Sequence, residues 1–126
     1  MATIKNDGLL ALAKLAGGVD SEAAFTYSAL GTGTTAESQT GTTLEGEITT
    51  GGAERKAATM SYEADYKTVW QVLWNFTATH AIRKIGIFNA AAAGRMLMEH
   101  LWAAARNVDN GDSMEVTLKM TAGRAA

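Results

Sequence analysis

The stretch that decides the fold is KTVWQVLWNFTATHAIRKIGIFNAAAAGRMLMEHLW, residues 67–102. It holds all three tryptophans of the chain and two of its three phenylalanines. In its first part every second residue is large or apolar, at Trp70, Val72, Trp74 and Phe76. A period of two is typical of a β-strand with one buried face. We therefore predict a strand over residues 67–79 whose aromatic row forms the centre of the core.

The rest of this stretch predicts two more strands. Residues 81–89 and 95–102 both alternate, and residues 90–94 between them form a predicted loop that ends in Gly94. Three strands in succession predict a β-meander. Residues 90–107 are also rich in alanine, which has the highest helix propensity, so a helix over this segment remains an alternative.

Outside this stretch the pattern is one of short strands and glycine-rich turns. Alternation predicts strands over residues 23–30, 54–66 and 113–121, and Asn110-Gly111 favours a tight hairpin turn before the last of them. Residues 31–43 form a predicted long Gly/Thr/Ser loop. Together these elements predict a mainly β protein, an antiparallel β-sandwich or barrel-like domain of about six strands.

The N-terminal part predicts one short amphipathic helix. Asp7 can cap it, and Gly17 and Gly18 can end it in the left-handed conformation. Its leucine face needs a partner, either its own domain or a neighbouring subunit, because an isolated helix of this length is only marginally stable. We therefore expect a single domain with a helical arm at residues 1–22, a β domain at residues 23–121 and a frayed tail at residues 122–126.

Composition excludes several classes of function. The 126 residues include no cysteine, which rules out disulfides, thiolate zinc sites and cysteine nucleophiles. The formal net charge of −2 offers no attraction to nucleic acid or to an anionic membrane, and we expect neither as a partner. No signal peptide and no apolar segment of membrane-spanning length is recognisable, so we expect a soluble unit.

Residues that could carry chemistry are few and scattered. The two histidines, His80 and His100, lack the spacing of metal ligands, and no serine lies in a nucleophile-elbow motif. We therefore expect no catalytic residue, no metal, no cofactor and no enzyme activity. Trp70 and Trp74 leave open a carbohydrate-binding or apolar-ligand-binding module, in which both rings would line a pocket.

Two charged residues interrupt a strand that is otherwise apolar. Arg83 and Lys84 stand among Ile82, Ile85 and Ile87. Charges in such a strand indicate either a sheet edge protected against wrong pairing or a contact with another subunit.

Three motifs resemble a group of small structural proteins encoded in the virion gene clusters of tailed bacteriophages. They are YSALGTGTT at residues 27–35, GIFNA at residues 86–90 and GDSM at residues 111–114. The resemblance covers most of residues 25–120. It implies a virion component, assembled in the host cytoplasm, that works without catalysis.

Within the virion the resemblance implies one of two roles. The first is a capsid decoration or cement protein that stabilises the shell by bridging neighbouring subunits, with the major capsid protein as a partner. The alternative is a tail component, such as a fibre or baseplate module. Either would form a homo-oligomer, possibly a trimer. We predict that the helix, the long loop and the charged strand make the contacts, through Leu9, Leu10, Leu12, Leu15, Thr32, Thr34, Arg83 and Lys84.

Overall fold

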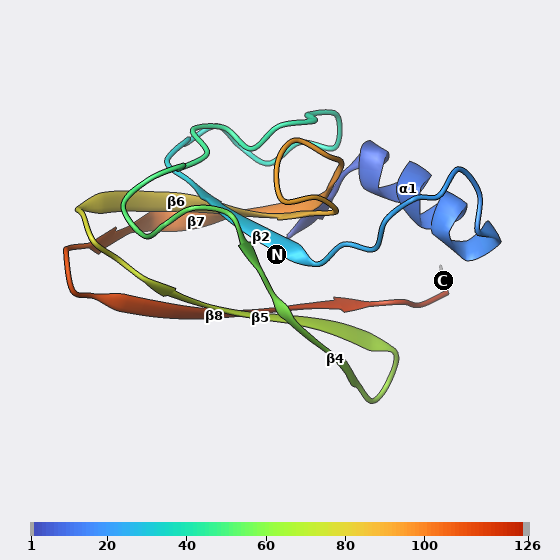
Figure 1. Cartoon of the computed structure of the whole chain (residues 1–126). Helices are drawn as coiled ribbons and strands as arrows, with labels where there is room; N and C mark the ends of the chain where they lie inside the picture. Colours follow the sequence, from blue (N-terminus) through green and yellow to red (C-terminus); the bar gives the residue numbers. More distant parts are fainter. Residues whose placement is uncertain (1, 125–126) are drawn as a thin grey trace.

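The computed structural model describes residues 2–124 and contains two antiparallel β-sheets that lie face to face (Figure 1). The five-stranded sheet has the order β1 (Thr3–Ile4), β7 (Met96–Val108), β6 (His80–Phe88), β2 (Tyr27–Gly31) and β3 (Lys56–Ala57). The three-stranded sheet has the order β4 (Thr59–Glu63), β5 (Lys67–Asn75) and β8 (Ser113–Thr121). The helix α1 (Asn6–Gly17) packs against β7. The predicted mainly β sandwich with a short N-terminal helix is confirmed, and both sheets keep open edges rather than closing into a barrel.

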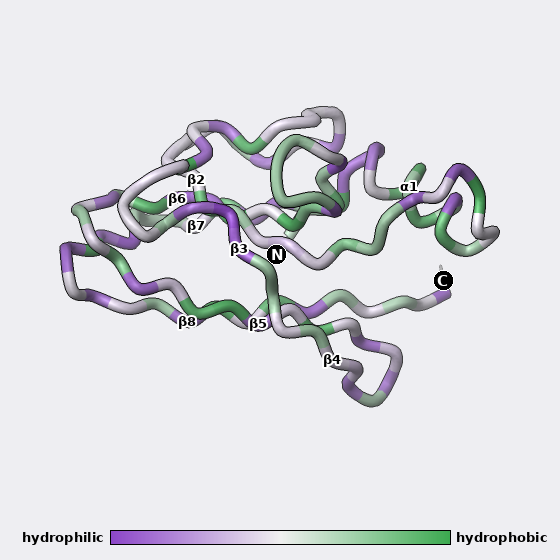
Figure 2. Tube along the Cα trace, in the orientation of Figure 1, coloured by the Kyte–Doolittle hydropathy of each residue, from purple (hydrophilic) through white to green (hydrophobic). Residues whose placement is uncertain are grey.

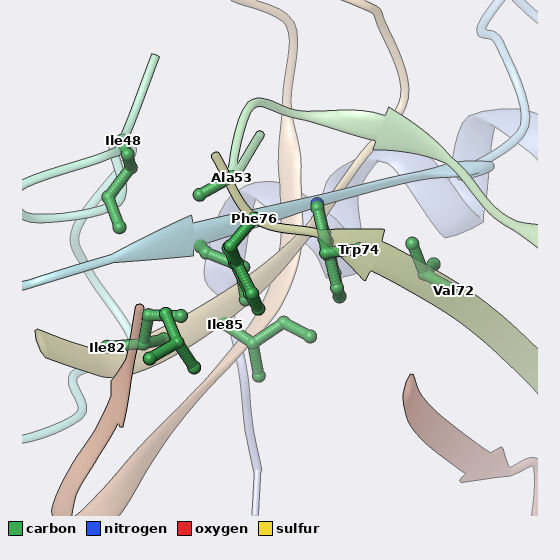
Figure 3. Close-up of a cluster of buried hydrophobic side chains, with 9 residues drawn as sticks. Ile48, Ala53, Val72, Trp74, Phe76, Ile82 and Ile85 are labelled. Carbon is green, nitrogen blue, oxygen red and sulfur yellow. The ribbon is translucent and has the colours of Figure 1, made fainter. Parts of the chain in front are cut away.

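The aromatic row of β5 fills the space between the sheets. Trp70, Val72 and Trp74 point inward from β5 and are buried, and Phe76 continues the row just beyond the strand. Val72, Trp74 and Phe76 cluster with Ile82 and Ile85 of the opposite sheet (Figure 3), and Trp70 clusters with Ile87 and Leu97. Burial of each side chain of this size contributes roughly 1.5–3 kcal/mol. Figure 2 shows hydrophobic residues in α1 and, interspersed with hydrophilic ones, along β5 and β8.

Both indole N–H groups of this row have backbone acceptors. Trp70 Nε1 donates to the carbonyl of Phe25 at 2.7 Å, and Trp74 Nε1 donates to the carbonyl of Glu54 at 3.0 Å. A buried indole N–H without an acceptor would be costly, so these bonds are required by the burial itself. They also fix the two segments that lead into β2 and β3.

The predicted meander is wrong, because β5 and β6 belong to different sheets. β4 and β8 occupy the two edges of β5, which leaves no edge for β6. β6 pairs instead with β2 and β7 in the opposite sheet. The predicted strand over residues 54–66 divides for a similar reason. Its halves, β3 and β4, lie in different sheets, and the amide of Ala58 between them donates to the carbonyl of Thr26 at 2.8 Å.

The alanine-rich segment is a strand, so the helical alternative is wrong. β7 continues through residues 103–107 to Val108 and pairs with β6 along most of its length. Pairing with a buried neighbour outweighs the local preference of alanine. The strand predicted over residues 23–30 begins only at Tyr27.

The Asn110-Gly111 turn does not form the hairpin that the sequence predicts. It links β7 in one sheet to β8 in the other. Gly111, with φ of 95°, donates its amide to the carbonyl of Phe76 at 2.9 Å, and the amide of Phe76 donates to the carbonyl of Asp112 at 2.8 Å. This is the hydrogen-bond pattern of a β-bulge with glycine in its first position. The turn therefore closes onto the end of β5 and carries the chain between the sheets.

The ends of the chain differ in part from expectation. The N-cap of α1 is Lys5, whose side chain makes no capping hydrogen bond to the helix, and Asp7 lies in the first turn instead of capping it. Gly18 ends the helix in the left-handed conformation, as predicted. In the tail predicted to fray, the amide of Ala122 donates to the carbonyl of Tyr66 at 2.9 Å. Residues 125 and 126 lie outside the described part of the chain.

α1 packs on its own domain through a close contact at Gly8. Gly8 and Ala11 are the buried residues of the helix, and Leu12 and Leu15 are half-buried against the same cluster. A Cβ added at Gly8 would lie 2.5 Å from the carbonyl oxygen of Leu97 and 2.8 Å from its Cα. Because both neighbours are backbone atoms of β7, they cannot move aside cheaply.

We predict that Gly8→Ala lowers the free energy of unfolding by about 1–3 kcal/mol, because the steric overlap exceeds the gain of roughly 1 kcal/mol in helix propensity. Urea unfolding measures the change. Ala13→Gly, on the exposed side of the same helix, isolates the propensity effect. A more stable Gly8→Ala variant would contradict this account of the packing.

Candidate contact surface

The four leucines predicted as contacts divide into two pairs. Leu9 and Leu10 are 56% and 47% exposed and point away from the domain. Leu12 and Leu15 pack against the cluster that contains Phe25 and Trp70. Of the four leucines, Leu9 and Leu10 are therefore the two that another molecule can contact without a change in the packing of α1.

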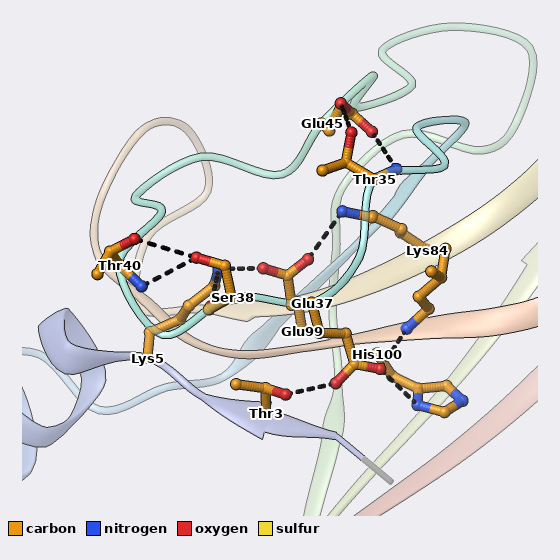
Figure 4. Close-up of polar contacts among 11 residues, drawn as sticks. Thr3, Lys5, Thr35, Glu37, Ser38, Thr40, Glu45, Lys84, Glu99 and His100 are labelled. Carbon is orange, nitrogen blue, oxygen red and sulfur yellow. Dashed lines mark hydrogen bonds and ion pairs between the residues drawn. The ribbon is translucent and has the colours of Figure 1, made fainter.

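The long loop after β2 is fastened to the five-stranded sheet by Glu37. Its carboxylate accepts hydrogen bonds from the hydroxyl of Thr3 at 2.6 Å and from the amide of Leu101 at 2.8 Å (Figure 4). β1 pairs with β7 only at Met98 and Glu99, so the edge of β7 is free beyond them. There the amide of Leu101 donates to Glu37 instead of to a neighbouring strand. His100 Nδ1 lies 3.4 Å from the same carboxylate, without hydrogen-bond geometry.

The pKa of Glu37 reflects this position. Burial acts to raise the pKa, but the hydrogen bonds from Leu101 and Thr3 outweigh it, so the pKa of Glu37 lies below its usual value. The folded state therefore favours the ionised carboxylate. This contribution to stability is present above the pKa of the unfolded chain and is lost as the pH falls through the lower folded value.

A buried group of three charges lies beneath the loop. Lys5, Lys84 and Glu99 are 1%, 3% and 4% exposed. Glu99 pairs with Lys5 through one carboxylate oxygen and with Lys84 through the other, at 3.0 Å. Lys5 also donates to the carbonyl of Ser38 at 2.6 Å. One carboxylate thus compensates two ammonium groups, and Lys5 ties the loop to the start of α1.

The charged pair in β6 serves the domain's own interior. β6 is a central strand, so the predicted sheet edge is wrong, and Lys84 is too deeply buried to meet another subunit. Arg83 lies where the β6–β7 register shifts, facing residues 102–105 of β7. Its guanidinium donates to the carbonyl of Trp102 at 3.1 and 3.2 Å. This shift also breaks the predicted alternation and places Ile82 and Ile85 in one buried cluster.

Thr32 and Thr34 are exposed at the start of the long loop, as a contact role requires. The loop is held here by Glu45, whose carboxylate accepts from the hydroxyl of Thr35 at 2.6 Å and from its amide at 3.0 Å. These hydrogen bonds, the hydroxyl first, lower the pKa of Glu45.

The structure brings two of the three predicted contact elements together. The amide of Asn6 at the start of α1 donates to the carbonyl of Gln39 in the loop at 2.8 Å. The loop runs over the five-stranded sheet and reaches this end of the helix (Figure 1). The helix is met by Gln39, whereas Thr32 and Thr34 lie where the loop is bonded to residues 45 and 46. We call the exposed Leu9, Leu10, Thr32 and Thr34 together the candidate contact surface.

Sequence reasoning missed Lys5, Glu37 and Glu99. A signal existed for Glu99, because it and Lys84 are opposite charges in two successive apolar strands. Buried charges in proteins are almost always paired, so each predicts the other. Lys5 and Glu37 lie in segments without periodicity, and nothing in their spacing indicates a partner.

An apolar groove borders the helix and the three-stranded sheet. It has a volume of about 290 Å³ and is lined by Leu12, Leu15, Phe25, Met60, Trp70 and Met120. Trp74 is not part of its wall. The groove therefore does not match the alternative in which Trp70 and Trp74 line one ligand pocket together.

Residues 2–124 provide neither a cluster of metal ligands nor a membrane-spanning helix. Within residues 2–124, no group of three or more His, Cys, Asp or Glu residues is placed to hold a metal ion. His80 contacts the carbonyl of Gly51 through Nε2 at 3.2 Å and lies against Phe76. In the same part of the chain, no helix combines the length and apolar character needed to cross a membrane.

The three buried charges predict that two substitutions, Glu99→Gln and Lys84→Met, lower the free energy of unfolding by different amounts. Glu99→Gln leaves two buried ammonium groups without a counter-charge and should lower the free energy of unfolding by about 3–5 kcal/mol. Lys84→Met leaves Lys5 and Glu99 as a neutral pair and should cost far less. Thermal and urea unfolding of both variants measures the difference. Equal costs would contradict a carboxylate shared by two lysines.

The loop attachment predicts a pH-dependent stability. Glu37→Gln keeps the shape of the side chain but removes its charge, and should lower the free energy of unfolding by about 1–2 kcal/mol at neutral pH. The difference from the original protein should shrink as the pH falls, since protonation removes the same charge. Urea unfolding across the acidic range tests this, with the exposed Asp65→Asn as control. A difference that grows on acidification would be the wrong sign.

Comparison with known proteins adds no family to this description. No protein-family model matches the chain, and no curated protein matches it. A function is therefore proposed from the residues, their geometry and the resemblance of the three motifs.

Proposed function

We propose that this chain is a non-enzymatic structural protein of a tailed-bacteriophage virion, acting as a capsid decoration or cement protein. The observation that carries the proposal is the resemblance of three motifs at residues 27–35, 86–90 and 111–114. The first motif covers β2 and the start of the long loop, the second the end of β6, and the third the start of β8. The motifs thus lie in both sheets and in a contact element.

The shape of the contact surface supports this role. Leu9 and Leu10 present apolar area on a helix that is itself packed tightly on β7. The neighbouring loop is held by Glu37, Lys5 and Glu45. A loop that is ordered before binding loses less conformational entropy when it binds. Such a surface suits repeated docking on a shell of identical subunits.

The mechanism would be burial of interface area in many copies. Each copy that bridges two shell subunits adds an interface that must be broken before the subunits separate. A modest contact repeated over a whole particle then gives a large gain in mechanical stability. A tail component would use the same contacts at fewer sites.

The proposal predicts that the chain is found on particles and that Leu10 contributes to its attachment. Gold-labelled antibody against the chain, applied to particles of the phage that encodes it, locates it on the capsid or on the tail. Attachment is then measured by co-sedimentation of purified protein with particles that lack it. Leu10→Ser should weaken attachment about tenfold or more, because it removes an apolar side chain from the proposed interface.

Leu73→Ser is the matched control, because Leu73 is 46% exposed, close to the 47% of Leu10, but lies on the three-stranded sheet. It should bind as the original protein does. Label on the tail would favour the tail component, and the absence of label from all particles would refute the proposal. Equal binding by both variants would remove α1 from the contact.

A further inference from the structure

β8 is a long sheet edge without the usual protection. It pairs with β5 through nine consecutive residues without a register shift, and no other strand in residues 2–124 pairs with its second edge. Natural edge strands are usually short, bulged, covered or interrupted by proline, because their free N–H and C=O groups invite pairing with another chain. The chain contains no proline, and β8 is neither short nor bulged; its two charged residues, Glu115 and Lys119, are of opposite sign.

The inward row of β8 is also incompletely covered. Met114, Val116, Leu118 and Met120 are only half-buried, whereas Trp70, Val72 and Trp74 of β5 beside them are buried. A hollow of about 210 Å³ lies at this rim, lined by Trp102, Met114 and Val116 among others. A further strand beside β8 would cover the row and fill the hollow.

The hydrogen bonds at the two ends of the β5–β8 ladder show which β8 residues face the free edge. Phe76 bonds with Gly111 and Asp112 at one end, and Ala122 bonds with Tyr66 at the other. In an antiparallel ladder the bonding residues alternate. Met114, Val116, Leu118 and Met120 therefore bond to β5. Ser113, Glu115, Thr117, Lys119 and Thr121 direct their N–H and C=O groups to the free edge.

We propose that β8 pairs antiparallel with β8 of a second copy of this chain, about a twofold axis at Thr117. This register joins all five outward-bonding residues and places Glu115 opposite Lys119 of the second copy, twice over. It also places Val116 opposite Leu118 and Met114 opposite Met120, so apolar side chains meet on the inner face. The two three-stranded sheets become one continuous sheet across the dimer.

The charges support this register over others. Glu115 has no ion-pair partner among residues 2–124, and Lys119 has only an exposed one, Glu63, at 3.0 Å. Exposed pairs of that kind contribute little, so Lys119 is available to a new partner. Opposite charges directly across two strands stabilise the pairing, and like charges destabilise it. A shift by two residues along either strand would separate Glu115 from Lys119.

The other free edge of this sheet fits a second copy less well. β4 has five residues against the nine of β8, and a β4–β8 contact would be heterologous. Heterologous contacts continue into rings or filaments, whereas twofold β8 pairing closes with two copies. The β8 edge thus favours a dimer as the unit of self-association, whether or not the chain has the virion role.

Charge reversal tests the register. In a dimer of the Glu115→Lys variant, a lysine faces Lys119 of the second copy at two places. In a dimer of the Lys119→Glu variant, a glutamate faces Glu115 at two places. Each repulsion should raise the dimer dissociation constant about tenfold or more. Mixing the two variants restores opposite charges at both positions, so a heterodimer should form with the original affinity. Sedimentation equilibrium at micromolar concentration measures the dissociation constants of the two variants and of their mixture. Asp65→Lys, with a similar charge change in the β4–β5 turn, should dimerise normally.

Cross-linking tests the position of the axis. Paired Thr117→Cys residues would have Cα atoms about 5.5 Å apart, within the range of a disulfide. Mild oxidation should link this variant as a dimer and leave Ser61→Cys, on the edge strand β4, unlinked. A monomer at every concentration, no heterodimer on mixing, or linkage through Ser61→Cys instead of Thr117→Cys would each overturn the proposal. Dimers that fail to bind particles would refute only the virion role.

Discussion

The burial of two tryptophans on β5 is the constraint on which the rest of the structure depends. Their rings separate the two sheets, and their N–H groups must find acceptors away from water. The carbonyls of Phe25 and Glu54 are those acceptors, and they lie just before β2 and β3. One strand of the smaller sheet thereby fixes how the chain enters two strands of the larger one.

The larger sheet has a different kind of interior on each face. Toward β5 it is apolar, with Ile82, Ile85 and Ile87 buried. On its other face Lys84 and Glu99 lie beneath the long loop, joined by Lys5. Apolar packing tolerates exchange of one side chain for another of similar volume, whereas a shared carboxylate requires its partners in place. The sandwich is thus positioned by shape, whereas the loop is held by charge and, at Leu44 just after it, by apolar packing against Phe88 and Met96.

Much of the fold could be predicted from the sequence, because alternation reports directly on burial. The inward rows of β5 and β8 follow it residue by residue. The assignment of strands to sheets could not be predicted, since β5 and β6 are adjacent in sequence yet both edges of β5 are taken by more distant strands. At the contact surface, the exposure of Leu9 and Leu10 agreed with expectation. The burial of Lys84 did not, because its partner Glu99 lies on another strand.

The register shift at Arg83 divides the β6–β7 ladder into two parts. On one side His80 to Ile82 pair with Val108 to Arg106, and on the other Lys84 pairs with Leu101. In an unbroken ladder, one inserted residue would turn every later side chain to the opposite face. Here residues 102–105 already lie outside regular pairing, so an inserted residue can be absorbed there. Sequence changes at Ala103, Ala104 and Ala105 of β7 are thereby uncoupled from the pairing on either side of them.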